Sequence, residues 1–253
     1  MNILEIEHLH AAFPGNTVLH DINLAIQTGR KTAIVGESGS GKTVLAQGVM
    51  RLNPDVSLQG SMRFQGEDLL ALPEKSLRKL RGRDIGMVFQ EPMTALNPVM
   101  PVGRQIAEVL TLHLGLDKRA AWQKAIDLLR ETGIQDAEEK VFAYPFQLSG
   151  GQRQRVMIAM AVAAEPKLLI ADEPTTALDV AVQAQILDLL ARLQRERNMT
   201  ILYITHDLNL VRRFADDGAV MRYGKIVEQG AVADIFANPQ HEYTRLLLDA
   251  VPQ

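Results

Sequence analysis

The chain has 253 residues, 47% of them hydrophobic and 23% charged, which is ordinary for a globular protein that buries a full core. Its net charge of −3 gives no sign of a nucleic-acid partner, and the absence of cysteine excludes disulfides and thiolate metal sites in this sequence. The N-terminus does not read as a secretory signal, and no apolar run approaches the ~18 residues of a membrane span. If the protein works at a membrane, we expect other chains to hold it there.

The first ninety residues are rich in short β-type runs separated by turn residues. The predicted strands are 3–9, 18–26, 31–35, 61–64 and 85–89. A helix is expected at 44–52, directly after a loop rich in glycine and serine.

The middle of the chain changes to helical periodicity, from about residue 102 to 164, with 122–132 as one example. Two almost wholly apolar runs follow at 167–171 and 200–205, as expected of strands buried on both faces of a parallel sheet. A helix is predicted between them at 182–197. This alternation predicts an α/β core with a parallel sheet, and the helical middle reads as an insertion into it.

A phosphate-binding motif of the form G-x-x-x-x-G-K-[ST] stands between the strand at 31–35 and the helix after it. Its residues are Gly36, Glu37, Ser38, Gly39, Ser40, Gly41, Lys42 and Thr43. Glycines let backbone N–H groups turn toward phosphate oxygens, and the helix N-terminus adds its positive dipole end. Lys42 can reach the β- and γ-phosphates, and the Thr43 hydroxyl can bind Mg²⁺. The motif alone indicates only a nucleoside triphosphate.

Two adjacent carboxylates, Asp172 and Glu173, end the apolar run at 168–171. Ligands bind at the carboxyl ends of parallel strands, and neighbouring residues on a strand point to opposite sides. We therefore expect Asp172 to face a Mg²⁺ shell and Glu173 to face an attacking water, as general base or as the group that orients the water.

A second anion site is indicated by Ser149, Gly150, Gly151 and Gln152, which follow Leu148 at the start of a helix. One phosphate loop already serves one ATP, so a second site needs an explanation. With this LSGGQ sequence the chain resembles the ATP-binding cassette (ABC) ATPases. The resemblance implies that this motif caps the γ-phosphate of an ATP held by a second, identical or homologous cassette, which gives a head-to-tail dimer.

Four further features occur in the order of that family. Gln90 resembles the Q-loop glutamine, which implies contact with the metal and relay to the transporter. The sequence Ala177-Leu178-Asp179 resembles the D-loop of the dimer interface. His206 resembles the switch histidine at the γ-phosphate, and Phe13 stands where the family places an aromatic residue on adenine.

The resemblance covers about residues 2–250 and implies a P-loop NTPase (RecA-like) core with an N-terminal antiparallel β subdomain. It implies one nucleotide-binding domain over 1–253: a core at 1–92 and 164–240, a helical subdomain at 93–163 and a tail at 241–253. It also implies an ATPase with ATP and Mg²⁺ as ligands, peripheral at the cytoplasmic face of the membrane. Its partners would be transmembrane permeases and, indirectly, an extracytoplasmic substrate-binding protein.

Three stretches are similar to ATPase subunits of peptide and nickel importers: FQEPMTALNP at 89–98, YPFQ at 144–147 and the tail at 235–247. Glu242 departs from the proline usual in that branch. Peptide is the favoured cargo, with nickel and metal chelates left open. The sequence leaves open whether the chain is a complete subunit or half of a tandem fusion.

Two other classes are less well supported. Soluble ABC ATPases of DNA repair have long coiled-coil insertions between the two phosphate motifs, and those of translation have two cassettes and a basic linker; neither feature is present here. A non-catalytic cassette would lack the base or the switch residue, whereas Glu173 and His206 are both present.

Overall fold

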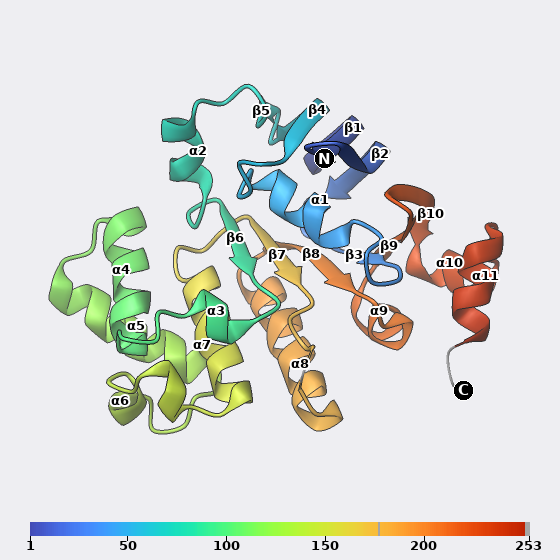
Figure 1. Ribbon diagram of the computed structural model, residues 1–253. Helices are drawn as coiled ribbons and strands as arrows, with labels where there is room; N and C mark the ends of the chain where they lie inside the picture. The colour runs from blue at the N-terminus through green and yellow to red at the C-terminus, as the bar shows by residue number, and fades with distance from the viewer. Residues whose placement is uncertain (177, 251–253) are drawn as a thin grey trace. The chain divides into compact units, whose positions relative to one another are not determined.

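The computed structural model describes residues 1–176 and 178–250, which form two compact units (Figure 1). Unit 1 contains Met1–Arg78 and the described chain from Thr200 onward, and unit 2 is Lys79–Met199. These boundaries differ from the predicted subdomain plan of core, helical insertion and tail, and that plan stays a prediction. Among the described residues, none of the helices combines the length and the apolar character needed to cross a bilayer.

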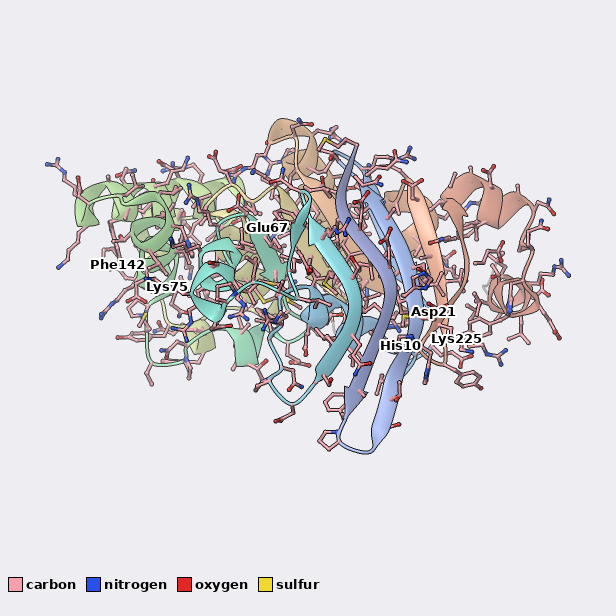
Figure 2. The ribbon with its side chains drawn as sticks, turned by 90° about the horizontal axis from the view of Figure 1, so that it is seen from above. His10, Asp21, Glu67, Lys75, Phe142 and Lys225 are labelled. Carbon is pink, nitrogen blue, oxygen red and sulfur yellow. The ribbon has the colours of Figure 1, made fainter. Side chains whose placement is uncertain are left out.

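Unit 1 begins with an antiparallel sheet in the order β2-β1-β4-β5. Its strands are β1 (Asn2–Phe13), β2 (Asn16–Gln27), β4 (Ser57–Phe64) and β5 (Glu67–Asp68). Figure 2 shows the long strands of this sheet side by side along their length, with labels at His10 of β1 and Asp21 of β2. The strands are longer than predicted because the ladder continues through bulges where the apolar alternation is interrupted.

The second sheet of unit 1 places β3 (Lys31–Val35) between β8 (Thr200–Thr205) and β9 (Asp217–Arg222), parallel to both. All six residues of β8 and four of the five in β3 are buried, which is why both strands could be predicted from apolar runs. The antiparallel partner of β9, β10 (Lys225–Ala231), completes a hairpin that the sequence analysis missed.

The helices of unit 1 connect and flank these strands. They are α1 (Lys42–Val49), α9 (Leu208–Phe214), α10 (Val232–Ala237) and α11 (Glu242–Asp249), while α2 (Glu74–Leu80) crosses the boundary to unit 2. The first helix begins two residues earlier than predicted, inside the phosphate motif itself.

Unit 2 contains one parallel strand pair, β6 (Ile85–Val88) and β7 (Leu168–Asp172), and is otherwise helical. Its helices are α3 (Pro92–Ala95), α4 (Val102–Leu114), α5 (Lys118–Glu131), α6 (Ala137–Lys140), the 3₁₀ turn Pro145–Gln147, α7 (Gly150–Val162) and α8 (Val180–Glu196). Asp117 caps α5 by accepting from the N–H groups of Arg119 and Ala120, both at 2.9 Å.

A single arginine ties three helix ends of unit 2 together. Arg197, just after α8, donates from Nη2 to both carboxylate oxygens of Glu131 at 2.8 and 2.7 Å, at the end of α5. Its Nη1 donates to the carbonyl of Val162 at 2.7 Å, at the end of α7. Only 14% of the Arg197 side chain and 27% of the Glu131 side chain are exposed, so this bidentate pair is poorly screened by water.

We expect Arg197→Met to lower the free energy of unfolding by about 2 kcal/mol, because it removes the bidentate partner of the half-buried Glu131 carboxylate and one of the two donors to the Val162 carbonyl. Denaturant titration measures the loss. The matched control is Arg78→Met at the exposed Arg78–Glu74 pair, where the change should stay below about 0.5 kcal/mol. An equal loss of unfolding free energy in the two variants would contradict a stabilising role for the Arg197–Glu131 pair.

Candidate functional site

The phosphate motif forms the loop between β3 and α1, as its spacing predicts. Gly36 is packed so closely against the β9 backbone that an added Cβ would lie 2.1 Å from the carbonyl oxygen of Met221. Gly39 and Gly41 have φ of 80° and 100°, in the left-handed region that favours glycine. Each of these glycines is therefore needed for backbone geometry. The loop crest formed by Glu37, Ser38 and Gly39 is exposed.

Lys42 lies inside this loop and is only 4% exposed. Its Nζ donates to the carbonyl oxygens of Gly36 and Glu37, both at 2.8 Å, and to the Ser40 hydroxyl at 3.4 Å. These contacts hold the ammonium group inside the loop, and the next residue in the sequence, Thr43, carries a hydroxyl group.

His206 lies at the same edge of the unit 1 sheet as the phosphate loop. The last residues of β3 and β8, Val35 and Thr205, pair in parallel register. Gly36 and His206, which follow them directly, therefore leave the sheet at adjacent positions. The His206 side chain is exposed, and the next residue, Asp207, begins α9 by accepting from the Asn209 N–H at 2.8 Å. The topology thus brings together two motifs that are far apart in the sequence.

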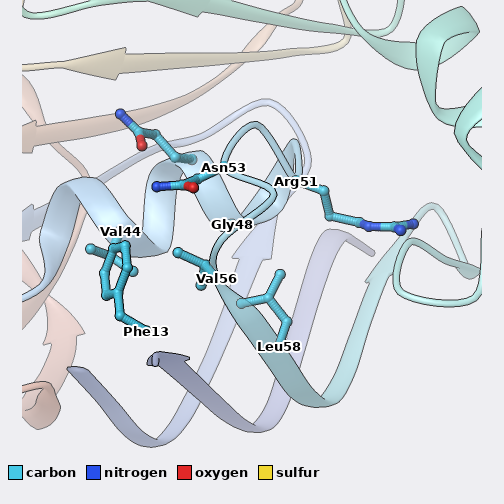
Figure 3. A pocket seen from close by; sticks show the side chains of 8 residues that line it. Phe13, Val44, Gly48, Arg51, Asn53, Val56 and Leu58 are labelled. Carbon is cyan, nitrogen blue, oxygen red and sulfur yellow. The ribbon is translucent and has the colours of Figure 1, made fainter. Parts of the chain in front are cut away.

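Phe13 lines a pocket beside α1, as Figure 3 shows. Val44, the residue after Thr43, lines the same pocket. The pocket is lined by Phe13, Val44, Gln47, Gly48, Arg51, Asn53, Val56 and Leu58. An aromatic ring and aliphatic groups beside a phosphate loop make a surface that suits the flat face of a base.

In unit 2 the structure brings Gln90 and the acidic pair together, because Val88 of β6 pairs with Ala171 of β7. Asp172 is the last residue of β7 and is 2% exposed. Glu173 lies outside the strand, with a left-handed φ of 44°. The strand-alternation argument for its direction is therefore wrong, and a strained turn aims the side chain instead.

The Glu173 carboxylate is oriented by two side chains of its own unit. Its Oε2 accepts from Gln90 Nε2 at 3.3 Å and from the Thr176 hydroxyl at 2.8 Å. The sequence analysis missed Thr176, although a hydroxyl three residues after a carboxylate is a recognisable local hydrogen-bond pattern.

The signature residues form the N-terminus of α7 with a reciprocal capping box. The Ser149 hydroxyl accepts from the Gln152 N–H at 3.3 Å, and the Gln152 side chain accepts from the Ser149 N–H at 3.0 Å. Gly150 and Gly151 keep the first turn bare, and a Cβ on Gly151 would lie 3.1 Å from Val182.

The predicted D-loop lies beside this turn. A Cβ on Gly150 would be 3.8 Å from the Leu178 side chain, within ordinary contact. Asp179 caps α8 by accepting from the Val182 N–H at 2.9 Å. Ala177 lies outside the described residues.

The phosphate loop of unit 1 has room for a triphosphate. Within the described chain, a Cβ added at Gly39 meets no atom within 4 Å, so the crest faces open space above the buried ammonium group. Each unit contains hard oxygen donors of the kind that Mg²⁺ prefers: the Thr43 hydroxyl in unit 1, and the Asp172 carboxylate and the Gln90 amide oxygen in unit 2.

Comparison with known proteins decides the family. The model of the family described as ABC transporter matches residues 19–176. The chain belongs to the ABC transporter family. An ABC relative from Bacillus subtilis, the oligopeptide transport ATP-binding protein OppD, is 49% identical over 99% of this chain and 72% of its own length.

One of the ABC relatives is about twice as long as this chain. The peptidoglycan transport ATP-binding protein YejF of Agrobacterium fabrum is 50% identical over 99% of this chain, which spans only 47% of YejF. The dipeptide transport ATP-binding protein DppD of Lactococcus lactis is 48% identical over 99% of this chain and 74% of its own length.

Solved ABC structures confirm the predicted fold class. The dimeric post-hydrolysis state of the ATP-binding cassette MJ0796 bound to ADP and Pi has a TM-score of 0.81 at 27% identity, covering 90% of this chain and 98% of that one. The structure of cbiO1 from Clostridium perfringens, part of the transporter complex cbiONQ, has a TM-score of 0.80 at 31% identity, covering 99% and 96%.

Alanine substitution separates two uses of glycine in the phosphate loop. Gly36→Ala should lower the free energy of unfolding by about 3 kcal/mol because its methyl group collides with the Met221 carbonyl. Gly39→Ala adds only the left-handed strain of about 1–2 kcal/mol. Denaturant titration without nucleotide measures both, and a larger loss at Gly39 would contradict this packing.

Proposed function

We propose that this chain hydrolyses ATP as the motor subunit of an importer for peptides. The observation that carries the proposal is the pairing of two anion sites in one chain: the loop around Lys42 and the bare N-terminus of α7. The family and the names of OppD and DppD support a transport ATPase with peptide cargo rather than nickel.

The phosphate loop, Gly36 to Thr43, holds the triphosphate through backbone N–H groups and Lys42. Phe13 covers the adenine face. Thr43 and Asp172 supply oxygens for Mg²⁺, and Gln90 adds its amide oxygen; when bound, the ion neutralises phosphate charge.

Glu173 positions the attacking water and takes its proton. Gln90 and Thr176 both donate to Oε2 of this carboxylate, which holds the group in one orientation. His206 donates to the γ-phosphate as charge builds up there.

Hydrolysis needs a second cassette in this proposal. Ser149, Gly150, Gly151 and Gln152 of one chain bind the γ-phosphate held by the other, and Asp179 lies at the dimer interface. A related cassette is described as dimeric with ADP and Pi, which supports the arrangement. The permeases that receive the movement, the substrate-binding protein and the cytoplasmic membrane face as location belong to this proposal.

Glu173→Gln should reduce ATP turnover by about 10²- to 10⁴-fold, because an amide cannot take the proton from water. The Kd for Mg-ATP should stay within about threefold, since the amide keeps the carboxylate's shape. Phosphate release and fluorescent-nucleotide binding measure the two quantities. Glu139→Gln, the same change at an exposed site of unit 2, is the control. Normal turnover in Glu173→Gln would exclude this residue as base.

Gly150→Asp tests the contribution of the second cassette. The site accommodates a side chain, and an acid in the first turn of α7 favours the helix dipole, so the monomer should not lose stability. The new carboxylate should repel a γ-phosphate from the other chain. We expect unchanged ATP affinity in the monomer and turnover reduced at least about 100-fold. Weakened ATP binding by the monomer would contradict a role across the dimer.

A further inference from the structure

The C-terminal helix α11 reaches the phosphate loop through one phenol. Tyr243, in the first turn of α11, is 1% exposed. Its hydroxyl accepts a hydrogen bond from the backbone N–H of Glu37 at 3.2 Å, across 206 positions of sequence. Both residues belong to unit 1. The contact is therefore part of one compact body.

The Glu37 N–H belongs to the same peptide group as the Gly36 carbonyl, and that carbonyl accepts from Lys42 Nζ at 2.8 Å. The two ends of a trans peptide point in opposite directions. Tyr243 thus holds the outer end of the group, and Lys42 is bonded to the inner end. A rotation of this peptide plane would break both hydrogen bonds at once.

The phenol is itself held in place. The Arg222 guanidinium stacks on the Tyr243 ring at 4.3 Å and on the Tyr223 ring at 4.9 Å. Arg222 lies between two residues that contact the phosphate loop: Met221, whose carbonyl faces Gly36, and the turn residue Gly224, whose N–H donates to Ser40 O at 3.0 Å. The β9–β10 turn and α11 therefore support the loop jointly.

The start of α11 is fixed to β10 by a carboxylate. Glu228 accepts from the N–H groups of Gln240 and His241 at 2.8 and 3.0 Å. Burial opposes its ionisation, yet these backbone hydrogen bonds help to hold the pKa of Glu228 below its usual value. His241 then caps the helix by accepting from the Tyr243 N–H at 3.1 Å.

We infer that Tyr243 is a positioning residue of the nucleotide site, which fixes the Gly36–Glu37 peptide so that Lys42 stays aligned for phosphate. The inference rests on the proposed function in that the loop binds a triphosphate. Burial raises the pKa of the Tyr243 phenol, so its hydroxyl remains protonated at neutral pH and adds no charge to the site. Its contribution is preorganisation: the loop is held in its binding shape before nucleotide arrives.

Tyr243→Phe removes the hydroxyl and keeps the ring that Arg222 covers. With the full chain, we expect the Kd for Mg-ATP to rise about fivefold, the value of one ordinary hydrogen bond. The kcat at saturating ATP should stay within about twofold, because the variant leaves the reacting groups in place. The melting temperature without nucleotide should fall only slightly.

Hydrogen exchange gives a readout that needs no nucleotide. In the nucleotide-free protein, Tyr243→Phe should increase the exchange rate of the Glu37 amide about fivefold. Tyr223→Phe is the matched control, because it removes a hydroxyl from the other ring stacked on Arg222, at a side chain that is 73% exposed. It should change neither the exchange rate nor the Kd.

The possible results are distinct. Unchanged Kd and unchanged Glu37 exchange in Tyr243→Phe would overturn the inference, as would a lower melting temperature with an unchanged Kd, which indicates a merely structural role. If the parent chain bound no Mg-ATP, the proposed function would fail and the nucleotide part of the inference with it. Faster Glu37 exchange in that case would still support the positioning of the loop.

Discussion

The hydrogen bonds from Lys42 to its own loop are the interaction on which the nucleotide site depends. Burying an ammonium group is costly, and two carbonyl oxygens at 2.8 Å offset much of that cost. Those carbonyls face inward only because Gly36 packs against the β9 backbone without a side chain. The loop therefore holds its ammonium group in place before an anion binds, so that binding costs little additional conformational entropy of this side chain.

The motif residues of unit 2 make stabilising contacts within their own chain, without a second cassette. Ser149 and Gln152 cap α7, and Asp179 caps α8. Glu173 holds a left-handed conformation that glycine would adopt more easily, which is the kind of strain found where a side chain must be aimed. A single chain thus orders Ser149, Gln152 and Asp179, which in the proposed dimer lie at the other chain's nucleotide or at the interface. Association then requires little reorganisation of them.

Features that depend on local sequence could be predicted, whereas features that depend on tertiary contacts could not. Strands β3 and β8 were predicted to the residue, since each is an apolar run bounded by polar or glycine-rich sequence. The β9–β10 hairpin was missed because β10 alternates poorly and its turn, Tyr223-Gly224, lacks the common Asn-Gly signal. The motif residues were recognisable by spacing, whereas the orientation of Glu173 was not. The contact of Tyr243 with Glu37 depends on tertiary structure and left no trace in the sequence.

The supports of the phosphate loop come from the far end of the chain, outside the residues 19–176 that the family model matches. A fused protein, an affinity tag or a ligand that displaces α11 would move the Tyr243 hydroxyl. The Gly36–Glu37 peptide, which is bonded to both Tyr243 and Lys42, would then shift as well. Changes made next to α11 therefore act on the phosphate loop, although that loop lies near the other end of the sequence.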